Sequence, residues 1–440
     1  SSVTPEGKEI KNKIDAIEFL VTKLRKHRRI TQSDADIALM QKKMFLKKVL
    51  SYDVLPHLGP DLKKKSIFIC YMTKKLIEVM LGRKPPDDRD ALQNKRVETP
   101  GVLLGQLFRQ NLKKMLNEVG KQFRKKNNSD ENPINVINLI NSTTITQGIK
   151  TGLATGIWGM NRTKKGVAQS LQRLSWVQAI SYLRRIMSPS LDASTQKVTS
   201  IRHLNNIQYG FMCPTQTPEG GKIGIVKSLA FMSTISFQND SQVEIIKNLI
   251  ADFKKIKFAN DVNPLDFNSW IKVFINGDLY CMTKKAYELF LFLKIKRKEG
   301  KIDKFVSISL NFNFKEIYIY SDGGRLIRPL LVVKDNKLLL TEKINKEIKE
   351  ILSSNNSTKG WFKIVSKYPE IIEYEDIVSS NYIMIAEDQK YLKESYQASE
   401  RKVDYSESTK INRYGDYRFV NYSHCEMDSW LILGLIASNI

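Results

Sequence analysis

Hydrophobic residues recur at helical spacing in three stretches of the first 125 residues. Residues 35–50, 62–81 and 101–123 place apolar side chains three and four positions apart, with lysines between them. Gly82 ends the second stretch, and the prolines at positions 85 and 86 prevent its continuation. The spacing predicts three amphipathic helices whose apolar stripes pack into a core.

Short apolar runs separated by glycine and proline replace this pattern after residue 141. Alternating apolar and polar positions predict strands at residues 270–275, 317–320 and 330–333. Asn276 and Gly277 follow the first of these strands and favour a hairpin, because both tolerate the positive φ of a type I′ turn. The second half of the chain is therefore expected to mix strands with helices.

Three further segments complete the picture. Residues 284–298 predict a basic helix, residues 167–183 predict another helix, and the polar residues 389–418 predict a loop. At 440 residues the chain exceeds what one hydrophobic core usually organises, and no internal repeat is visible. We expect a multidomain α+β protein with a helical N-terminal part and mixed α/β domains after it.

Positive charge dominates the composition. Lysines and arginines number 71 against 46 acidic residues, which gives a formal net charge of +25. Such a surplus favours a polyanionic partner, because lysine and arginine neutralise phosphates and release counterions. A solvated basic surface encoded by AT-rich codons explains the same charge and also the abundance of Lys, Ile and Asn. Charge alone leaves both interpretations open.

Cysteine and histidine are sparse and scattered. The four cysteines, at positions 70, 213, 281 and 425, form no CxxC pair, and only four histidines could assist them. This spacing predicts neither a zinc site nor a disulfide framework. No apolar run reaches the roughly 20 residues that cross a bilayer, and the first residues lack a signal-peptide pattern. We expect a soluble intracellular chain with no membrane partner.

Residues 209–227 contain the most informative pattern in the chain. They read Tyr-Gly-Phe-Met-Cys-Pro-Thr-Gln-Thr-Pro-Glu-Gly-Gly-Lys-Ile-Gly-Ile-Val-Lys. Two prolines and four glycines restrict the backbone to a rigid turn, which suits close approach to a ligand but also fits an ordinary structural loop. The segment resembles, almost position for position, the Cys-Pro-x-x-Thr-Pro-Glu-Gly and Gly-Leu-Val-Lys segment of the second-largest, β-like subunit of multisubunit DNA-directed RNA polymerases.

Five further segments extend this resemblance in the same order. They are Asp-Asp-Arg-Asp to Asn-Lys-Arg at 87–96, Gly-Ile-Trp-Gly at 156–159, Leu-Arg-Arg-Ile-Met-Ser-Pro at 183–189, Asp-Gly-Gly-Arg-Leu-Ile-Arg-Pro-Leu at 322–330, and Ser-His-Cys-Glu with Ile-Leu-Gly at 423–434. Their wording is similar to the archaeal, eukaryotic and large-DNA-virus branch rather than the bacterial one. The Lys, Ile and Asn bias favours a large DNA virus or cytoplasmic element as source, so a virion, a host cytoplasm and a nucleus are all open as locations.

The resemblance implies a domain order. It is the end of the lobe (1–97), the returning part of the protrusion (98–157), the fork (158–236), external 1 (237–335), external 2 (336–395), and a loop with the start of the hybrid-binding domain (396–440). It also implies a function in transcription, in which this part shapes the active-centre cleft. The implied partners are the largest subunit and other polymerase subunits, template DNA, the RNA transcript and NTP.

Two loops of the implied fork are candidate nucleic-acid contacts. A basic turn at residues 161–165 carries Arg162, Lys164 and Lys165, and short cationic loops suit backbone phosphates, which are read by charge. A solvated loop explains the same charges. The resemblance places this turn at the first fork loop of the family and residues 190–200 at the second. The second loop carries Lys197 as its one basic residue and is longer than usual, so strand contact by it is less expected.

Four residues are candidate contacts to the nucleotide and active centre: Glu219, Arg202, Arg184 and Arg185. Arginine offers a planar fork of donors for phosphate oxygens. The resemblance places Glu219 close to the nucleotide addition site, where a lone carboxylate would act through electrostatics and positioning. Gln216 stands where the family usually has a glutamate, which removes a charge.

Arg325 and Arg328 have two possible roles, of which one needs no ligand. They could bind phosphate, but pairing with carboxylates to lock a domain interface requires no ligand. We expect the second arrangement for both arginines.

The chain lacks the carboxylate motif that holds catalytic metal in this family. Two-metal nucleotidyl transfer needs clustered carboxylates, and no Asp-x-Asp-Gly-Asp run or Gly-x4-Gly-Lys-Ser/Thr loop occurs. The resemblance implies that Mg²⁺ is held mainly by the largest subunit, so no catalytic residue is expected here and the chain should be inactive alone. It also places the zinc-binding clamp beyond residue 440.

Two other classes of protein fit parts of the sequence. A stand-alone basic nucleic-acid-binding protein would explain the charge and need no partner. A structural assembly module of a split polymerase subunit would explain the apolar run at residues 431–440, which has no stop signal and needs cover from another segment or polypeptide. Recovery in a complex with a largest subunit would separate these alternatives.

Overall fold

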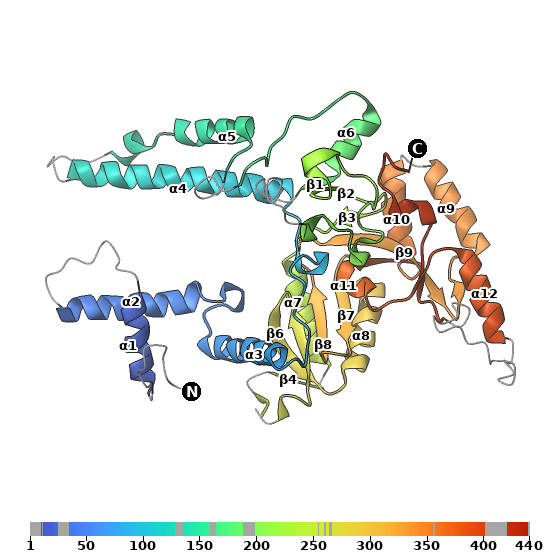
Figure 1. Cartoon of the computed structure of the whole chain (residues 1–440), viewed down its shortest axis with the longest axis horizontal. Coiled ribbons are helices and arrows are strands. Elements are labelled where there is room, and N and C mark those ends of the chain that lie inside the picture. Colours follow the sequence, from blue (N-terminus) through green and yellow to red (C-terminus); the bar gives the residue numbers. More distant parts are fainter. Residues whose placement is uncertain are drawn as a thin grey trace. The chain divides into compact units, whose positions relative to one another are not determined.

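The structure is a computed structural model of the chain (Figure 1). It describes residues 10, 12–24, 35–127, 135–158, 164–187, 199–253, 255–258, 261–263, 266–354, 357–400 and 420–438. The chain forms two compact units, each built from segments that are distant in sequence. The first unit is Ser1–Asp87, Phe253–Ala286 and Phe312–Tyr318, and the second is Asp88–Asp252, Tyr287–Asn311 and Ile319–Ile440.

Helices and a small sheet make up the first unit. The helices are α1 (Lys13–Lys23), α2 (Ala35–Tyr52), η1 (Pro56–Leu58) and α3 (Leu62–Met80). The neighbouring strands, in sheet order, are β4 (Ile256–Phe258), β6 (Asp278–Thr283), β5 (Ile271–Ile275) and β8 (Glu316–Tyr320), whose last residues belong to the second unit. The side chain of Asp61 caps α3 by accepting hydrogen bonds from the N–H groups of Lys63 and Lys64, which lack partners within the helix.

The β5–β6 hairpin holds the core of this unit. Asn276 and Gly277 form its turn with φ values of 49° and 86°, as the Asn-Gly pair predicts. Tyr71 of α3 packs against Phe274 of β5 and Met282 of β6. The hairpin therefore joins α3 to a segment about 200 positions later in the chain.

The second unit contains the remaining elements. Its helices are η2 (Leu92–Asn94), α4 (Pro100–Asn127), η3 (Val136–Leu139), α5 (Thr143–Thr155), α6 (Trp176–Leu183), η6 (Ser200–Arg202), η7 (Asn206–Gln208), η8 (Gly220–Lys222), α7 (Ser241–Asp252), α8 (Ala286–Lys298), α9 (Glu342–Ser354), α10 (Ser357–Lys367), α11 (Ile377–Ser380), α12 (Gln389–Glu400) and η13 (Ser429–Ile432). Its strands are β1 (Arg185–Met187), β2 (Val226–Ser228), β3 (Thr234–Ile235), β7 (Ser307–Asn311), β9 (Leu326–Lys334), β10 (Lys337–Leu338), β11 (Ile372–Asp376), β12 (Ile385–Ala386) and β13 (His424–Cys425).

Helices α4 and α5 lie side by side because α5 carries two glycines four positions apart (Figure 1). A Cβ added at Gly148 would lie 2.0 Å from Asn111 Oδ1, and one added at Gly152 would lie 2.9 Å from Leu107 Cδ2. Only glycine permits this close approach of the two helices.

Strand β9 is the centre of the main sheet. β3, β10, β11 and β13 all pair with it antiparallel, and β12 joins β13 in parallel. Except for Lys334, every residue of β9 is buried, which fits a near-continuous apolar run covered on both faces. The sheet therefore brings the segment at 322–330 next to the segment at 423–426.

Several sequence predictions are confirmed and others are wrong. The α+β class, the three long N-terminal helices, the basic helix and the three strands are present. The helix expected at 167–183 is wrong in extent, because only α6 forms there and its Ser175 N-cap starts it. The loop expected at 389–418 is wrong for its first part, where α12 forms. The rest of that segment lies outside the described residues.

The apolar stripes of α2, α3 and α4 do not pack as expected. Of the apolar residues in these stripes whose burial the structure describes, only Leu46, Tyr71, Leu107 and Met115 are buried. Met80 is 77% exposed and Leu116 is 57% exposed. Periodicity predicts which face of a helix is apolar but not what covers it, and among the described residues most of these faces remain uncovered.

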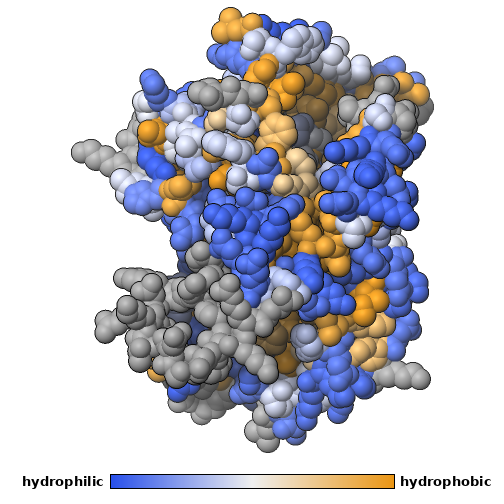
Figure 2. Space-filling view, turned by 90° about the vertical axis from the view of Figure 1, so that its right-hand side faces the viewer, coloured by the Kyte–Doolittle hydropathy of each residue, from blue (hydrophilic) through white to orange (hydrophobic). Residues whose placement is uncertain are grey.

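Hydrophobic side chains also reach the surface elsewhere. On the face shown in Figure 2, a band of hydrophobic residues lies between hydrophilic groups. None of the helices in the described ranges combines the length and the apolar character needed to cross a bilayer.

Candidate nucleic-acid and nucleotide interface

The segment at residues 209–227 is anchored at both ends in the core of the second unit. Phe211 and Met212 are buried with Leu229 and Leu326 in one apolar cluster. The backbone N–H of Cys213 donates to the carbonyl of Ser228 at 2.9 Å, which closes the two ends of the segment on each other. The turn between them is therefore held at a fixed position on the unit.

Hydrogen bonds inside the turn remove its remaining freedom. The Thr217 hydroxyl accepts from the N–H of Gly224 at 2.9 Å and donates to the carbonyl of Val226 at 3.0 Å. Arg202 Nη1 donates to the carbonyls of Gly221 and Ile223, both at 2.8 Å. Gly224 has a φ of 70°, and a Cβ there would lie 2.5 Å from the Arg202 carbonyl oxygen, so glycine is required.

Glu219 stands at the exposed tip of this braced turn. It occupies the N-cap position of η8, yet its carboxylate accepts no capping hydrogen bond. In the ranges that the structure describes, its side chain forms no hydrogen bond or ion pair and is exposed. A carboxylate held by a rigid backbone and free of protein partners can act on a ligand from outside.

The candidate arginines differ in their surroundings. Arg202 braces the turn, as described above. Arg184 follows α6, and its Nη2 lies 2.6 Å, 3.0 Å and 2.9 Å from the carbonyl oxygens of Ala230, Phe231 and Ser233. Burial lowers the pKa of Arg184 from its usual value. Arg184 is thus engaged by the backbone.

Arg185, in contrast, is exposed. Its guanidinium lies 4.7 Å from the centre of the Tyr182 ring, which is a cation–π distance. Arg185 begins β1, which pairs with β2 of the segment at 209–227. It is therefore the candidate arginine best placed to meet an external phosphate.

The first fork loop is only partly described. The Lys164 ammonium lies 2.7 Å and 2.6 Å from the two carboxylate oxygens of Glu98 and 3.1 Å from Gln106 Oε1. Lys165 beside it is exposed. Arg162 and Lys197 lie outside the described residues. The structure thus ties Lys164 to α4 and leaves Lys165 open to solvent.

Gln216 occupies a half-buried position at the base of the turn. Its Nε2 donates to the Ser181 hydroxyl at 2.7 Å, while its Oε1 is buried without a partner in the described part of the chain. Burial opposes ionisation of the adjacent Cys213 thiol, but hydrogen bonds from Thr215 and from the backbone at Gly434 and Gln216 lower its pKa below the usual value. The base of the turn is thus polar but carries no glutamate charge.

Arg328 joins three of the sequence motifs in one place. Its guanidinium forms a buried ion pair with Glu426 and lies 5.1 Å from the centre of the Phe211 ring. A Cβ added at Gly210, whose φ is 73°, would lie 2.0 Å from Arg328 Nη1. The expectation that Arg328 pairs with a carboxylate is confirmed, and the pair explains why Gly210 has no side chain.

Arg325 is paired in the same manner. Its Nη1 lies 3.2 Å from Asp376 of β11, its Nε lies 3.1 Å from Asp322, and its Nη2 donates to the carbonyl of Phe305 at 2.8 Å. It is 4% exposed, and each of its three guanidinium nitrogens has a partner inside the protein. Both arginines therefore stabilise the fold around β9.

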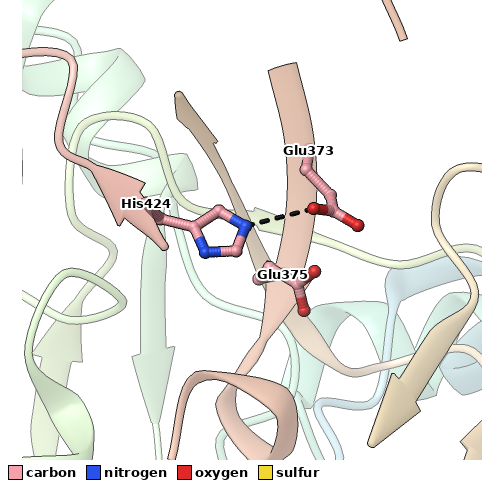
Figure 3. A group of neighbouring side chains, drawn as sticks. All are labelled: Glu373, Glu375 and His424. Carbon is pink, nitrogen blue, oxygen red and sulfur yellow. Dashed lines mark hydrogen bonds and ion pairs between the residues drawn. The ribbon is translucent and has the colours of Figure 1, made fainter. Parts of the chain in front are cut away.

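The sequence did not predict a buried group of Glu373, Glu375 and His424 (Figure 3). The two glutamates lie two positions apart on β11 and so share a face, and His424 of β13 reaches them across β9. Ligand atoms of the three residues lie within 4.8 Å of one another, as in a metal site. No spacing in the sequence signals this group, because sheet pairing alone brings β11 and β13 together.

Cations of α8 already face these carboxylates. Arg297 pairs with both Glu373 and Glu375, and the Lys294 ammonium lies 3.6 Å and 3.5 Å from them. Burial opposes ionisation of Glu373, but Arg297, the His424 hydrogen bond and Lys294 hold its pKa well below the usual range. Two carboxylates and two cations balance, so the group fits a buried ion-pair network better than a metal site.

Comparison with known proteins identifies the family to which the chain belongs. The family models described as RNA polymerase Rpb2 domain 2, domain 3 and domain 4 match residues 4–98, 169–235 and 273–334. Subunit 2 of the DNA-directed RNA polymerase of Acanthamoeba polyphaga mimivirus is 37% identical over 97% of this chain and 36% of its own length. Subunit RPB2 of RNA polymerase II from Encephalitozoon cuniculi is 34% identical over 93% of this chain and 34% of its own length.

An archaeal protein shows the same likeness. Subunit Rpo2 of the Sulfolobus acidocaldarius RNA polymerase is 35% identical over 66% of this chain and 27% of its own length. The chain is therefore of the multidomain polymerase-subunit class. It belongs to the Rpb2-like family of second-largest RNA polymerase subunits, in the branch shared by archaea, eukaryotes and viruses. It spans about a third of the length of the curated relatives it matches.

Proposed function

We propose that this chain is the part of a DNA-directed RNA polymerase second-largest subunit that shapes the active-centre cleft. In this role it contacts DNA, the RNA–DNA hybrid and incoming NTP during transcription. The domain order from lobe to hybrid-binding domain, with the boundaries given above, belongs to this proposal. The largest subunit and other polymerase subunits are its protein partners.

One observation carries the proposal most directly. The Glu219 carboxylate is exposed and without a protein partner among the described residues, yet Thr217, Arg202 and Gly224 hold its backbone rigidly. A fold gains no stability from such a residue, whereas an external ligand benefits from a group held in advance. Arg185, on the strand that pairs with β2, and Lys165, in the first fork loop, are exposed cations and supply phosphate contacts.

The remaining candidates take supporting roles. Arg202 and Arg184 position the turn through backbone carbonyls, and Lys164 fixes the first fork loop to Glu98. Mg²⁺ is held mainly by the largest subunit, and this chain supplies no catalytic residue. The chain is therefore inactive alone, and nucleotide transfer requires the assembled enzyme.

The test is a reconstituted polymerase that carries Glu219→Gln. We expect a slower rate of nucleotide addition, while assembly and the stability of the second unit stay unchanged. Glu299→Gln is the matched control, because Glu299 is an exposed glutamate outside the turn. Equal rates for Glu219→Gln and the unchanged enzyme would contradict the proposed role, and primer extension by the purified chain alone would contradict the proposed division of labour.

An assembly role is a second candidate, and the exposed apolar faces of α2, α3 and α4 favour it. Such faces require cover from other protein. This candidate predicts that Met80→Glu weakens recovery of the chain in a complex without changing nucleotide addition by the complex that does form.

A further inference from the structure

Four lysines of the first unit lie close together around α3 and β8. We call Lys74, Lys75, Lys84 and Lys272 the lysine cluster. The Lys84 ammonium lies 2.6 Å from Glu78 and that of Lys74 lies 3.9 Å from it, while Lys75 lies 3.5 Å from Glu316. With the neighbouring Arg83, five cations stand against two carboxylates, Glu78 and Glu316. Positive charge is therefore in excess at this place.

Glu316 supplies one negative charge against this excess. It is buried, and its carboxylate accepts short hydrogen bonds from the Tyr71 and Tyr318 hydroxyls. The same carboxylate also forms an ion pair with Lys75. The carboxylate keeps its charge in these bonds and also acts on Lys272, but one negative charge does not balance the surrounding lysines.

Lys272 raises the free-energy cost of the excess positive charge, because its ammonium is buried and poorly solvated. It is 5% exposed and lies 5.8 Å from the Tyr71 ring centre and 5.5 Å from that of Phe267. Burial lowers the pKa of Lys272, and Lys74, Lys75 and Lys84 lower it further against the opposing effect of Glu316. Like charges at a partly buried position repel strongly, and an external anion would relieve this repulsion.

An open pocket of about 360 Å³ adjoins the lysine cluster through Lys74 and Glu78. Its lining residues, all from α3 and the turn after it, are Cys70, Thr73, Lys74, Ile77, Glu78 and Arg83. Arg83 is exposed, and its guanidinium forms no hydrogen bond or ion pair within the described ranges. The guanidinium fork matches the oxygens of a phosphate group.

We propose that Lys74, Arg83 and Lys84 form a phosphate-binding site of the first unit, with a single-stranded nucleic acid as the source of the phosphate. The Phe314 ring favours a nucleic acid over a free phosphate. The Lys84 ammonium lies 4.8 Å from its centre and that of Lys75 lies 5.9 Å from it, and the ring is partly exposed. Cations beside an exposed aromatic ring are typical of surfaces on which the backbone is neutralised and a base stacks.

This site is separate from the residues already discussed. Glu219, Arg185 and Lys165 belong to the second unit, whereas every residue of the proposed site belongs to the first. Neither the resemblance in sequence nor the fork loops point to it. The inference thus adds a nucleic-acid contact to the proposed function and does not depend on the role of Glu219.

The experiment measures binding of a fluorescent single-stranded oligonucleotide to the full 440-residue chain at several salt concentrations. Arg83→Gln with Lys84→Gln removes two charges from the site, and Lys113→Gln with Lys114→Gln removes two exposed charges from α4 as the matched control. We expect the first variant to raise the Kd about tenfold, since hydrogen bonds to charged groups are strong. The slope of log K against log salt should fall by about 0.7 for each lost phosphate contact.

Further variants and a competition experiment identify the source of the phosphate and separate a loss of binding from a loss of folding. Arg83→Lys with Lys84→Arg keeps both charges and should keep most of the affinity. Arg83→Gln alone disturbs no partner in the described residues. It replaces the double variant in the binding experiment if the double variant unfolds at a lower temperature than the unchanged chain. Displacement of the oligonucleotide by inorganic phosphate would show that the site also takes free phosphate, and lack of displacement would assign it to the backbone of a strand.

Two outcomes would overturn the proposal. Equal losses of affinity in the site variant and in the α4 variant would mean that diffuse charge, not a site, binds the strand. Tighter binding of a polyglutamate peptide than of the oligonucleotide, lost in the site variant, would make the surface a dock for an acidic protein.

Discussion

Arg328 of β9 and Glu426, which follows β13, form a buried ion pair although 98 residues separate them in the sequence. The pair lies against Gly210 and Phe211 and so connects the main sheet to the segment that carries Glu219. Burial raises the pKa of Glu426, while Arg328 opposes this rise. The position of the candidate interface thus depends on a charge pair far from it in sequence.

Breaking that pair should destabilise the second unit. Glu426→Gln leaves Arg328 buried without a counter-charge, which costs about 3–5 kcal/mol of unfolding free energy. Replacing Arg328 and Glu426 together by Met and Leu should recover much of this loss, because no buried charge remains. Denaturant unfolding followed by tryptophan fluorescence measures the effect. Lys367→Gln, which breaks an exposed pair with Glu347, is the control and should shift the midpoint little.

Gly210→Ala and Gly220→Ala should differ in stability although both glycines have a positive φ. The φ values are 73° and 75°, so the backbone strain of about 1 kcal/mol is common to both variants. A Cβ at Gly210 meets Arg328, which Glu426 holds in place, whereas a Cβ at Gly220 meets nothing within 4 Å. We expect the Gly210 variant to unfold at clearly lower denaturant concentration. Equal midpoints would show that Arg328 can move aside.

The Glu373 network should make stability depend on pH on the acid side. The folded-state pKa of Glu373 lies well below its ordinary value of 4.5 because of Arg297, His424 and Lys294. Its contribution to stability is therefore complete above that value and is lost as the pH falls below it.

The matching variant is Glu373→Gln. It should be less stable than the unchanged chain at neutral pH, and the gap should narrow as the pH falls below 4.5. Unfolding midpoints measured across this range test the sign of the effect. A gap that stays constant with pH would mean that the Glu373 carboxylate contributes no charge interaction.

The neighbours Arg184 and Arg185 should behave differently when each is changed to methionine. Arg184→Met removes the side-chain donor to the carbonyls of Ala230, Phe231 and Ser233, of which Ala230 keeps the Ser233 N–H, so it should lower stability by about 1–3 kcal/mol. Arg185→Met removes an exposed cation, so it should leave stability unchanged and weaken nucleic-acid binding by the assembled polymerase. Unfolding and oligonucleotide binding measured on both variants give the comparison. Lower stability in the Arg185 variant and weaker binding in the Arg184 variant would contradict the roles assigned to the two arginines.

Local patterns were sufficient for much of the fold. Helical spacing predicted α2, α3 and α4, and the Asn276–Gly277 pair predicted the β5–β6 turn, because these features depend on neighbours along the chain. The same reasoning failed for residues 167–183 and for α12, where packing and capping decide whether a polar or mixed stretch becomes helical. It also failed for burial, because an apolar stripe does not say what covers it.

The sequence by itself determined the family, the α+β class, the excess of positive charge and the braced turn that carries Glu219. These follow from residue types at short spacing, which are visible without coordinates. Only the tertiary structure decided that Arg184, Arg202 and Lys164 are engaged by the protein while Glu219 and Arg185 face outward. It also assembled the Glu373 network and the lysine cluster, because sheet pairing and helix packing bring together side chains that no spacing along the chain relates.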